Sequence, residues 1–95
     1  MATTNTISIT ATNTAWALVA DGADVAVISV QVDPTTPSAY LAISQGSPNV
    51  NSNDYIVLQR ERDTSLTVNL NTGDQVYAKS ASQAPATVRA VLGGR

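Results

Sequence analysis

The chain has 95 residues, the size of one ordinary domain. It contains no cysteine and no histidine, which excludes disulfides, thiolate metal ligands and the commonest general base. Its five basic and seven acidic residues give a net charge of −2, without the clustered basic face that nucleic-acid binding requires. No stretch approaches the ~18 apolar residues of a membrane span, and the start of the chain lacks the features of a secretory signal.

Uncharged polar residues dominate the predicted surface. Charged residues make up 13% of the chain, against about 25% in typical domains. There are instead twelve Thr, nine Ser, seven Asn and five Gln. Such a surface can be buried against another protein without the cost of desolvating many charges.

The first predicted strand, residues 6–10, alternates polar and apolar side chains. We assign residues 1–13 to an N-terminal arm and this strand, and residues 14–95 to a single β-domain. Residues 2–5 are either a frayed tail or an arm that adds a strand to a neighbour. In the second case Thr3, Thr4 and Asn5 contact a partner.

Two apolar strands follow, at residues 15–20 and 25–32, with an Asp-Gly turn between them. The first is expected to place Trp16 and Leu18 on one face. The second is apolar on both faces, which is typical of a strand covered on both sides. Its minor face carries Val25 and Val27, and we expect a partner to contact these two residues.

The remaining predicted strands are 39–45, 55–59, 66–70, 75–79 and 87–92. Turn residues separate the strands at roughly ten-residue spacing, and no window has a helical period. The sequence therefore predicts an all-β fold, an antiparallel β-sandwich or jelly-roll-like barrel of about eight short strands. The charged bend after the strand 55–59 is either a solvated hairpin tip or a docking contact made by Arg60, Glu61, Arg62 and Asp63.

The chain offers little catalytic chemistry. Asp21 and Asp24 sit in a turn, where we expect them to serve the backbone. The loop with Asn49, Asn51, Asn53 and Asp54 loosely resembles a calcium loop, but it carries one carboxylate. Lys79, the sole lysine, is expected to face solvent from a strand, where lysine discourages unwanted edge pairing. We therefore expect no enzyme activity, metal or cofactor.

Four aromatic residues are the candidates for a sugar-stacking platform. They are Trp16, Tyr40, Tyr55 and Tyr77, and each lies in a different predicted strand. Packing at the core or its edge, with the hydroxyls directed outward, is the simpler interpretation.

The last third of the chain resembles small virion proteins of tailed bacteriophages. Those proteins often close with a polar turn, a strand of the form (V/L)-Y-A-(K/R)-S, a short loop of small residues and a terminal Val strand. The matching residues here are Gly73, Asp74, Val76, Tyr77, Ala78, Lys79 and Ser80, then Ala86, Thr87, Val88 and Arg89. The segment 39–48 (AYLAISQGSP) and Trp16 after a Thr-rich strand are also similar. The last loop has Ala81, Ala84 and Pro85 where many relatives have glycine.

This resemblance implies a non-enzymatic structural protein of a virion, assembled in a host cytoplasm. Its leading form is a capsid decoration protein that stabilises the outer surface of a phage head. The implied partners are the major capsid protein or another virion protein, with copies of the chain itself. The alternative is a carbohydrate- or receptor-binding module of a tail or fibre.

Overall fold

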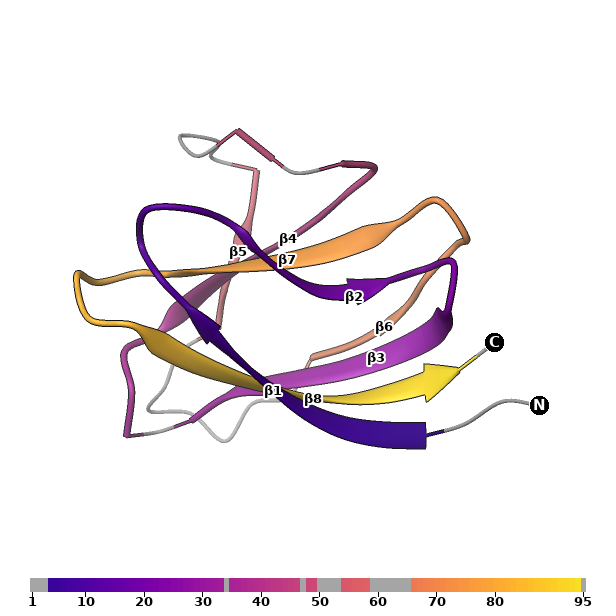
Figure 1. Cartoon of the computed structure of the whole chain (residues 1–95), viewed down its shortest axis with the longest axis horizontal. Helices are drawn as coiled ribbons and strands as arrows, with labels where there is room; N and C mark the ends of the chain where they lie inside the picture. Colours follow the sequence, from indigo (N-terminus) through magenta and orange to yellow (C-terminus); the bar gives the residue numbers. More distant parts are fainter. Residues whose placement is uncertain (1–3, 34, 47, 50–53, 59–65, 95) are drawn as a thin grey trace.

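The protein is a sandwich of two antiparallel sheets. The computed structural model describes residues 4–33, 35–46, 48–49, 54–58 and 66–94, and these form eight strands and no helix. The strands are β1 Thr4–Ala11, β2 Ala17–Asp21, β3 Val25–Val32, β4 Ala39–Ser44, β5 Ile56–Leu58, β6 Leu66–Asn69, β7 Gln75–Ser80 and β8 Ala86–Gly94. Sheet A has the order β1-β8-β3-β6 and sheet B the order β2-β7-β4-β5 (Figure 1). The predicted all-β sandwich is confirmed.

The pairing follows the jelly-roll order. β1 pairs with β8, β2 with β7, β3 with β6 and β4 with β5, so the second half of the chain runs back along the first. The additional pairs β3–β8 and β4–β7 join these four strand pairs into the two sheets. As in other jelly rolls, strand edges remain at both sides of the sandwich. β1 and β2 form one side, and β5 and β6 form the other.

Aliphatic side chains from both sheets fill the space between them. Alternate residues of β8 and β3 point inward, and Ile28, Val30 and Val88 are fully buried there. Val76 and Ala78 of β7 face them from the other sheet and are also fully buried. The period-2 alternation read from the sequence therefore predicts the core-facing positions of the central strands correctly.

Two register shifts change the facing of residues that simple alternation would misplace. β2 begins at Ala17, and the shift between Leu18 and Ala20 buries both Val19 and Ala20. A second shift lies between Val25 and Val27, and Val25 is 7% exposed within the core. The expectation that Val25 faces outward with Val27 is therefore wrong, because a bulge turns one residue of the pair to the other face.

At one end of the sandwich, two turns that connect the sheets are hydrogen-bonded to each other, and we call this contact the clasp. The turn after β2 and the turn before β7 both connect sheet A with sheet B. The Gly22 N–H donates a hydrogen bond to the Asp74 carbonyl at 2.7 Å. A Cβ atom on Gly22 would lie 2.0 Å from the Asn71 oxygen, so the contact requires glycine.

Candidate interaction surfaces

The described residues hold no cluster of side chains suited to bind a metal ion. No group of three or more Asp, Glu, His or Cys side chains comes together among them. Asp21 supports its own turn, as predicted: its Oδ1 accepts a hydrogen bond from the Ala23 N–H at 2.9 Å. In the turn before β7, the Asp74 carboxylate likewise accepts a hydrogen bond from the Asn71 N–H at 3.0 Å. Over these same ranges, no helix is long and apolar enough to cross a membrane.

The most exposed pairing edge is β1. Its eight residues pair with β8 in continuous register, from Thr4 opposite Gly93 to Ala11 opposite Ala86. Within the described part of the chain nothing pairs with its other edge. Edge strands are usually protected by shortness, bulges, proline or charge. β1 (TNTISITA) has none of these features.

In the described part of the chain, the other three edge strands are shorter or less regular than β1. β5 has three residues there and β6 has four, and β2 carries the register shift between Leu18 and Ala20. Each of them offers a shorter or more distorted row of backbone groups than β1. Of the four edges, β1 is therefore the one best suited to accept another strand.

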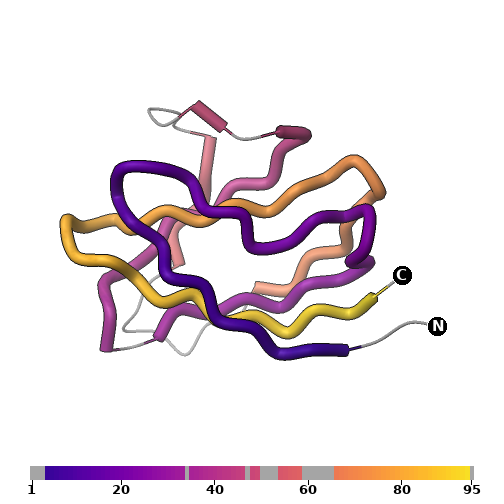
Figure 2. Tube along the Cα trace, in the orientation of Figure 1, coloured from indigo at the N-terminus to yellow at the C-terminus, as the bar shows by residue number. Residues whose placement is uncertain are grey.

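An apolar groove opens between the edge strands β1 and β2. It has a volume of about 340 Å³. Its lining combines the apolar residues Leu18, Val19, Val25 and Leu92 with the polar residues Asn5, Asp21 and Asp24, which we call its rim. β1 begins and β8 ends near this opening, where β1 and β2 diverge (Figure 2). Leu18 is 47% exposed at the margin of the groove, and it lies opposite Tyr77, so its side chain is directed to the outer face of sheet B.

The outer face of sheet A is almost uncharged in the described residues and has a shallow depression lined by Thr6, Ser29 and Val91. One cross-strand row consists of Thr6, Val91, Ser29 and Thr67. The Ser29 and Thr67 hydroxyls are hydrogen-bonded at 2.6 Å. In the neighbouring row Val27 lies beside Gly93 and is half-buried, so it faces outward as predicted.

The charged group on this face is already paired. Arg89 of β8 forms a salt bridge with Asp33, which follows β3. The pKa of Asp33 is lowered from 3.8 to about 2 because the Thr35 N–H and hydroxyl donate to its carboxylate, and because Arg89 donates as well. The pair fixes the end of β3 against β8 and leaves the face without an unbalanced charge.

The four aromatic residues gather on the outer face of sheet B, as a second small cluster. Tyr40 and Tyr55 stack with ring centroids 4.1 Å apart, and Trp16 lies 6.1 Å from Tyr55. Tyr77 and Trp16 are each 8% exposed. The Trp16 indole N–H donates to the Asn49 carbonyl at 3.0 Å and so ties the loop after β4 to the sheet.

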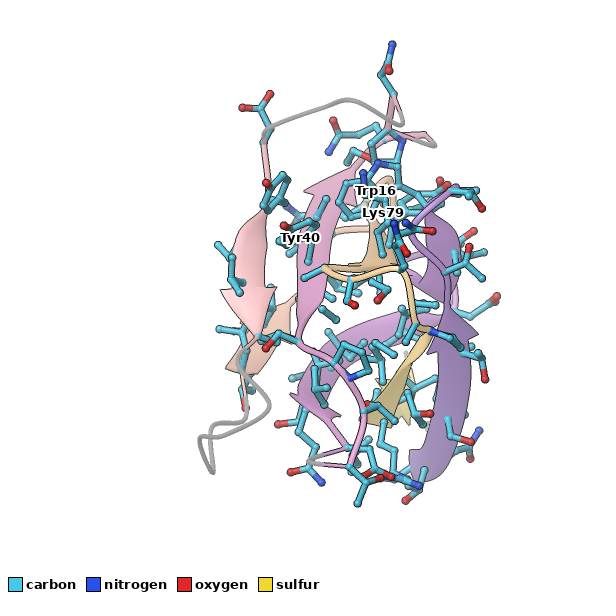
Figure 3. The ribbon with its side chains drawn as sticks, turned by 90° about the vertical axis from the view of Figure 1, so that its left-hand side faces the viewer. Trp16, Tyr40 and Lys79 are labelled. Carbon is cyan, nitrogen blue, oxygen red and sulfur yellow. The ribbon has the colours of Figure 1, made fainter. Side chains whose placement is uncertain are left out.

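Lys79 covers this cluster. Its ammonium lies 5.2 Å from the centre of the Trp16 ring and 6.0 Å from that of Tyr40. Figure 3 shows the lysine beside Trp16, with Tyr40 on the adjacent strand. The lysine is thus half-buried over aromatic rings and not simply solvent-facing. Loss of hydration raises the pKa of the Tyr55 hydroxyl, and Tyr40 raises it further.

These contacts cover part of the ring surface that a sugar would need, while Tyr40 and Tyr55 stay half-buried. A stacking platform presents an aromatic face to water, but Tyr55 covers Tyr40, and Trp16 is nearly buried. The interpretation as packing at the edge of the core fits the geometry better. The cluster holds loops on sheet B.

The predicted contact residues are divided by the structure. Asn5 and Val25 come together at the groove, the first at its rim and the second in its apolar wall. Thr4 lies at the start of β1, and Val27 lies on the outer face of sheet A. Thr3, Arg60, Glu61, Arg62 and Asp63 lie outside the described residues, as do Asn51 and Asn53.

The alternation pattern does not indicate that Leu18 and Leu92 line a common groove, because only the strand order brings these two residues to the same opening. The composition of β1 could have indicated a docking edge, since an eight-residue strand without charge or proline is unusual at the edge of a sheet.

Comparison with known proteins gives a fold relationship. No family model matches the chain, and no curated protein matches it. Among solved structures it is similar to a chain of the Bacillus endospore appendages, described as a novel family of disulfide-linked pili. The TM-score is 0.61 at 15% identity, and the match covers 99% of this chain and 86% of that one. At this identity the similarity shows a shared fold.

Proposed function

We propose that this chain is a non-enzymatic structural subunit that is present in many copies on a particle, and that it docks through β1. The observation that carries the proposal is the free edge of β1, eight residues long and unprotected, beside three short or bulged edges. A strand that adds to it forms main-chain hydrogen bonds without desolvating charges.

Capsid decoration of a phage head is the specific form of this proposal. It is supported by the resemblance of residues 66–92 to small virion proteins, by the charge-poor surface and by the jelly-roll fold, which viral capsid domains share. The partner is then the major capsid protein, and the protein is located in the virion. The aromatic cluster gives the glycan-binding alternative less support, because its ring faces are in contact with one another.

The appendage protein of similar fold is a pilus component, and this supports repeated assembly as a use of the fold. The present chain has no cysteine. Copies of these 95 residues would therefore associate without disulfides, through surfaces such as the β1 edge. Association with further copies of itself belongs to the same proposal.

Quantitative mass spectrometry of phage particles purified from cells that make the chain tests this function. We expect a constant, stoichiometric ratio of the chain to the major capsid protein. A few copies per particle, or none after density-gradient purification, would contradict the proposal.

A matched pair of variants tests the docking edge. Thr6→Lys places a charge on the edge strand β1, and Asn69→Lys places the same charge on β6, the opposite edge of the same sheet. Both positions are exposed, so both variants should fold. We expect Thr6→Lys to reduce the amount on particles several-fold and Asn69→Lys to leave it unchanged. Equal occupancy of the two would show that β1 is not the contact edge.

A further inference from the structure

We infer that the groove between β1 and β2 receives side chains of the strand that adds to β1, and that this strand carries aliphatic residues at alternate positions with a basic residue at one end. The inference deepens the proposed function, because it names the chemistry of the docking partner. It relies on that function only for the choice of β1 as the contact edge.

The position of the groove follows from the geometry of an added strand. A strand paired with β1 would lie about 4.8 Å beyond it in the plane of sheet A. Its inward side chains would continue the row that begins with Asn5 and Leu92, which are opposite each other in β1 and β8. That row faces β2 across the opening, where Leu18 and Val19 line the groove. Alternate side chains of the partner therefore enter it.

The lining selects aliphatic side chains. Leu18 is 47% exposed and Leu92 is partly buried, so both keep apolar surface in contact with water in the free chain. An aliphatic side chain in the groove would remove that surface from water. The outward side chains of the same strand would continue the small polar surface of Thr4 and Thr6, so the partner strand is expected to alternate aliphatic and polar residues.

The rim selects a positive charge. Asp21 and Asp24 lie together at the end of the groove, and no basic side chain lines it among the described residues. Both oxygens of Asp21 already accept hydrogen bonds, from the Ala23 N–H and from the Gln75 amide. Asp24 is exposed. A lysine or arginine near the end of the partner strand would balance these carboxylates, and its position at one end would fix the direction of the strand.

Capped synthetic peptides provide the probe. The sequences Lys-Thr-Val-Thr-Val-Thr-Val and Val-Thr-Val-Thr-Val-Thr-Lys place the lysine at either end, on the same strand face as the valines. Both are needed because strand direction decides which end meets Asp24. Amide chemical shifts of the ¹⁵N-labelled chain are followed during titration. We expect shifts along β1 and around Leu18, with one of the two peptides binding more tightly.

Two altered peptides separate backbone pairing from side-chain recognition. N-methylation of alternate amides on the pairing edge keeps the side chains and should abolish binding. Replacing the lysine by glutamate should weaken binding roughly two- to fivefold, the range of an exposed ion pair. Equal binding of the N-methylated peptide, or the same affinity with glutamate as with lysine, would overturn the inference.

Matched variants locate the groove. Leu18→Ser should weaken the lysine peptide roughly three- to tenfold, from the loss of a half-exposed aliphatic contact. Val57→Ser on β5 removes a side chain of similar exposure, 49% against 47%, and should have no effect. Asp24→Asn should remove the preference for lysine over glutamate, whereas Asp54→Asn should keep it. Shifts centred on β5 or β6 would contradict the assignment.

The two proposals can fail separately. If the chain binds the peptide along β1 but is absent from purified particles, the virion function is refuted and the groove assignment stands. Stoichiometric occupancy of particles by the Leu18→Ser and Asp24→Asn variants, equal to that of the unaltered chain, would refute the groove assignment alone.

Discussion

Substitution of Gly22 by alanine tests the clasp that closes one end of the sandwich. The added Cβ would lie 2.0 Å from the Asn71 oxygen and 2.7 Å from the Asp74 oxygen. Both atoms belong to backbone, so the two turns must separate by more than 1 Å to reach ordinary contact at about 3.4 Å. The 2.7 Å hydrogen bond from the Gly22 N–H to Asp74 would then be lost. Gly22 does not have a positive φ, so the cost is steric.

The expected cost is about 2–4 kcal/mol of unfolding free energy. Overpacking costs about 1–3 kcal/mol, and the lost hydrogen bond adds about 1 kcal/mol. For a domain of this size the change corresponds to a fall in Tm of roughly 10–25 °C. Urea unfolding followed by far-ultraviolet circular dichroism and by fluorescence of the single tryptophan, Trp16, measures it.

Gly73 provides the control in the facing turn. A Cβ there meets no atom within 4 Å, and its φ is also not positive. Gly73→Ala should leave stability unchanged or raise it by up to about 1 kcal/mol through the unfolded chain. A Gly22→Ala variant within about 0.5 kcal/mol of the unaltered protein, or equal loss in the two variants, would refute the steric explanation.

Three further predictions concern groups away from the clasp. The pKa of Asp33 in the folded protein is lowered to about 2, so its contribution to stability is present above pH 4 and is lost as the pH falls from 4 through 2. Asp33→Asn should remove this part of the pH dependence of Tm, measured from pH 5 to pH 2. Ser80→Ala should cost about 1–2 kcal/mol in urea unfolding. Ser80 is 1% exposed, and its hydroxyl donates to the Ala84 carbonyl at 2.6 Å and accepts from the Ser82 N–H at 3.2 Å, so both hydrogen bonds would be lost. An unchanged urea midpoint would contradict this. Lys79→Met should cost less than about 1 kcal/mol and shift the Trp16 emission, since the methionine keeps the packing and loses the cation–π contact; an unaltered spectrum would count against that contact.

The strands themselves were predictable because their pattern is local. The run 25–32 coincides with β3, and the alternation of residues 66–69 and 75–79 corresponds to β6 and β7. Alternation failed at the bulges. Val25 and Ala20 both turn toward the core, because an extra residue on one strand reverses the facing of its neighbours.

The interaction surfaces depend on contacts between distant residues. Trp16 meets Asn49 across 33 positions of the chain, and Tyr40 lies opposite Lys79. Neither contact has a local sequence signal. The aromatic residues could therefore be identified from the sequence, but their contacts with one another could not be predicted. The groove likewise requires the strand order, which places Leu18 of β2 near Leu92 of β8.

The most direct test of docking through β1 is an electron cryo-microscopy reconstruction of particles that carry the protein. We expect the jelly roll in repeated copies, with a strand of the neighbouring protein paired along β1 from Thr4 toward Ala11 and its side chains over Leu18. Copies seated by another surface, for example the outer face of sheet A, with the β1 edge open to solvent, would contradict the proposed mode of assembly.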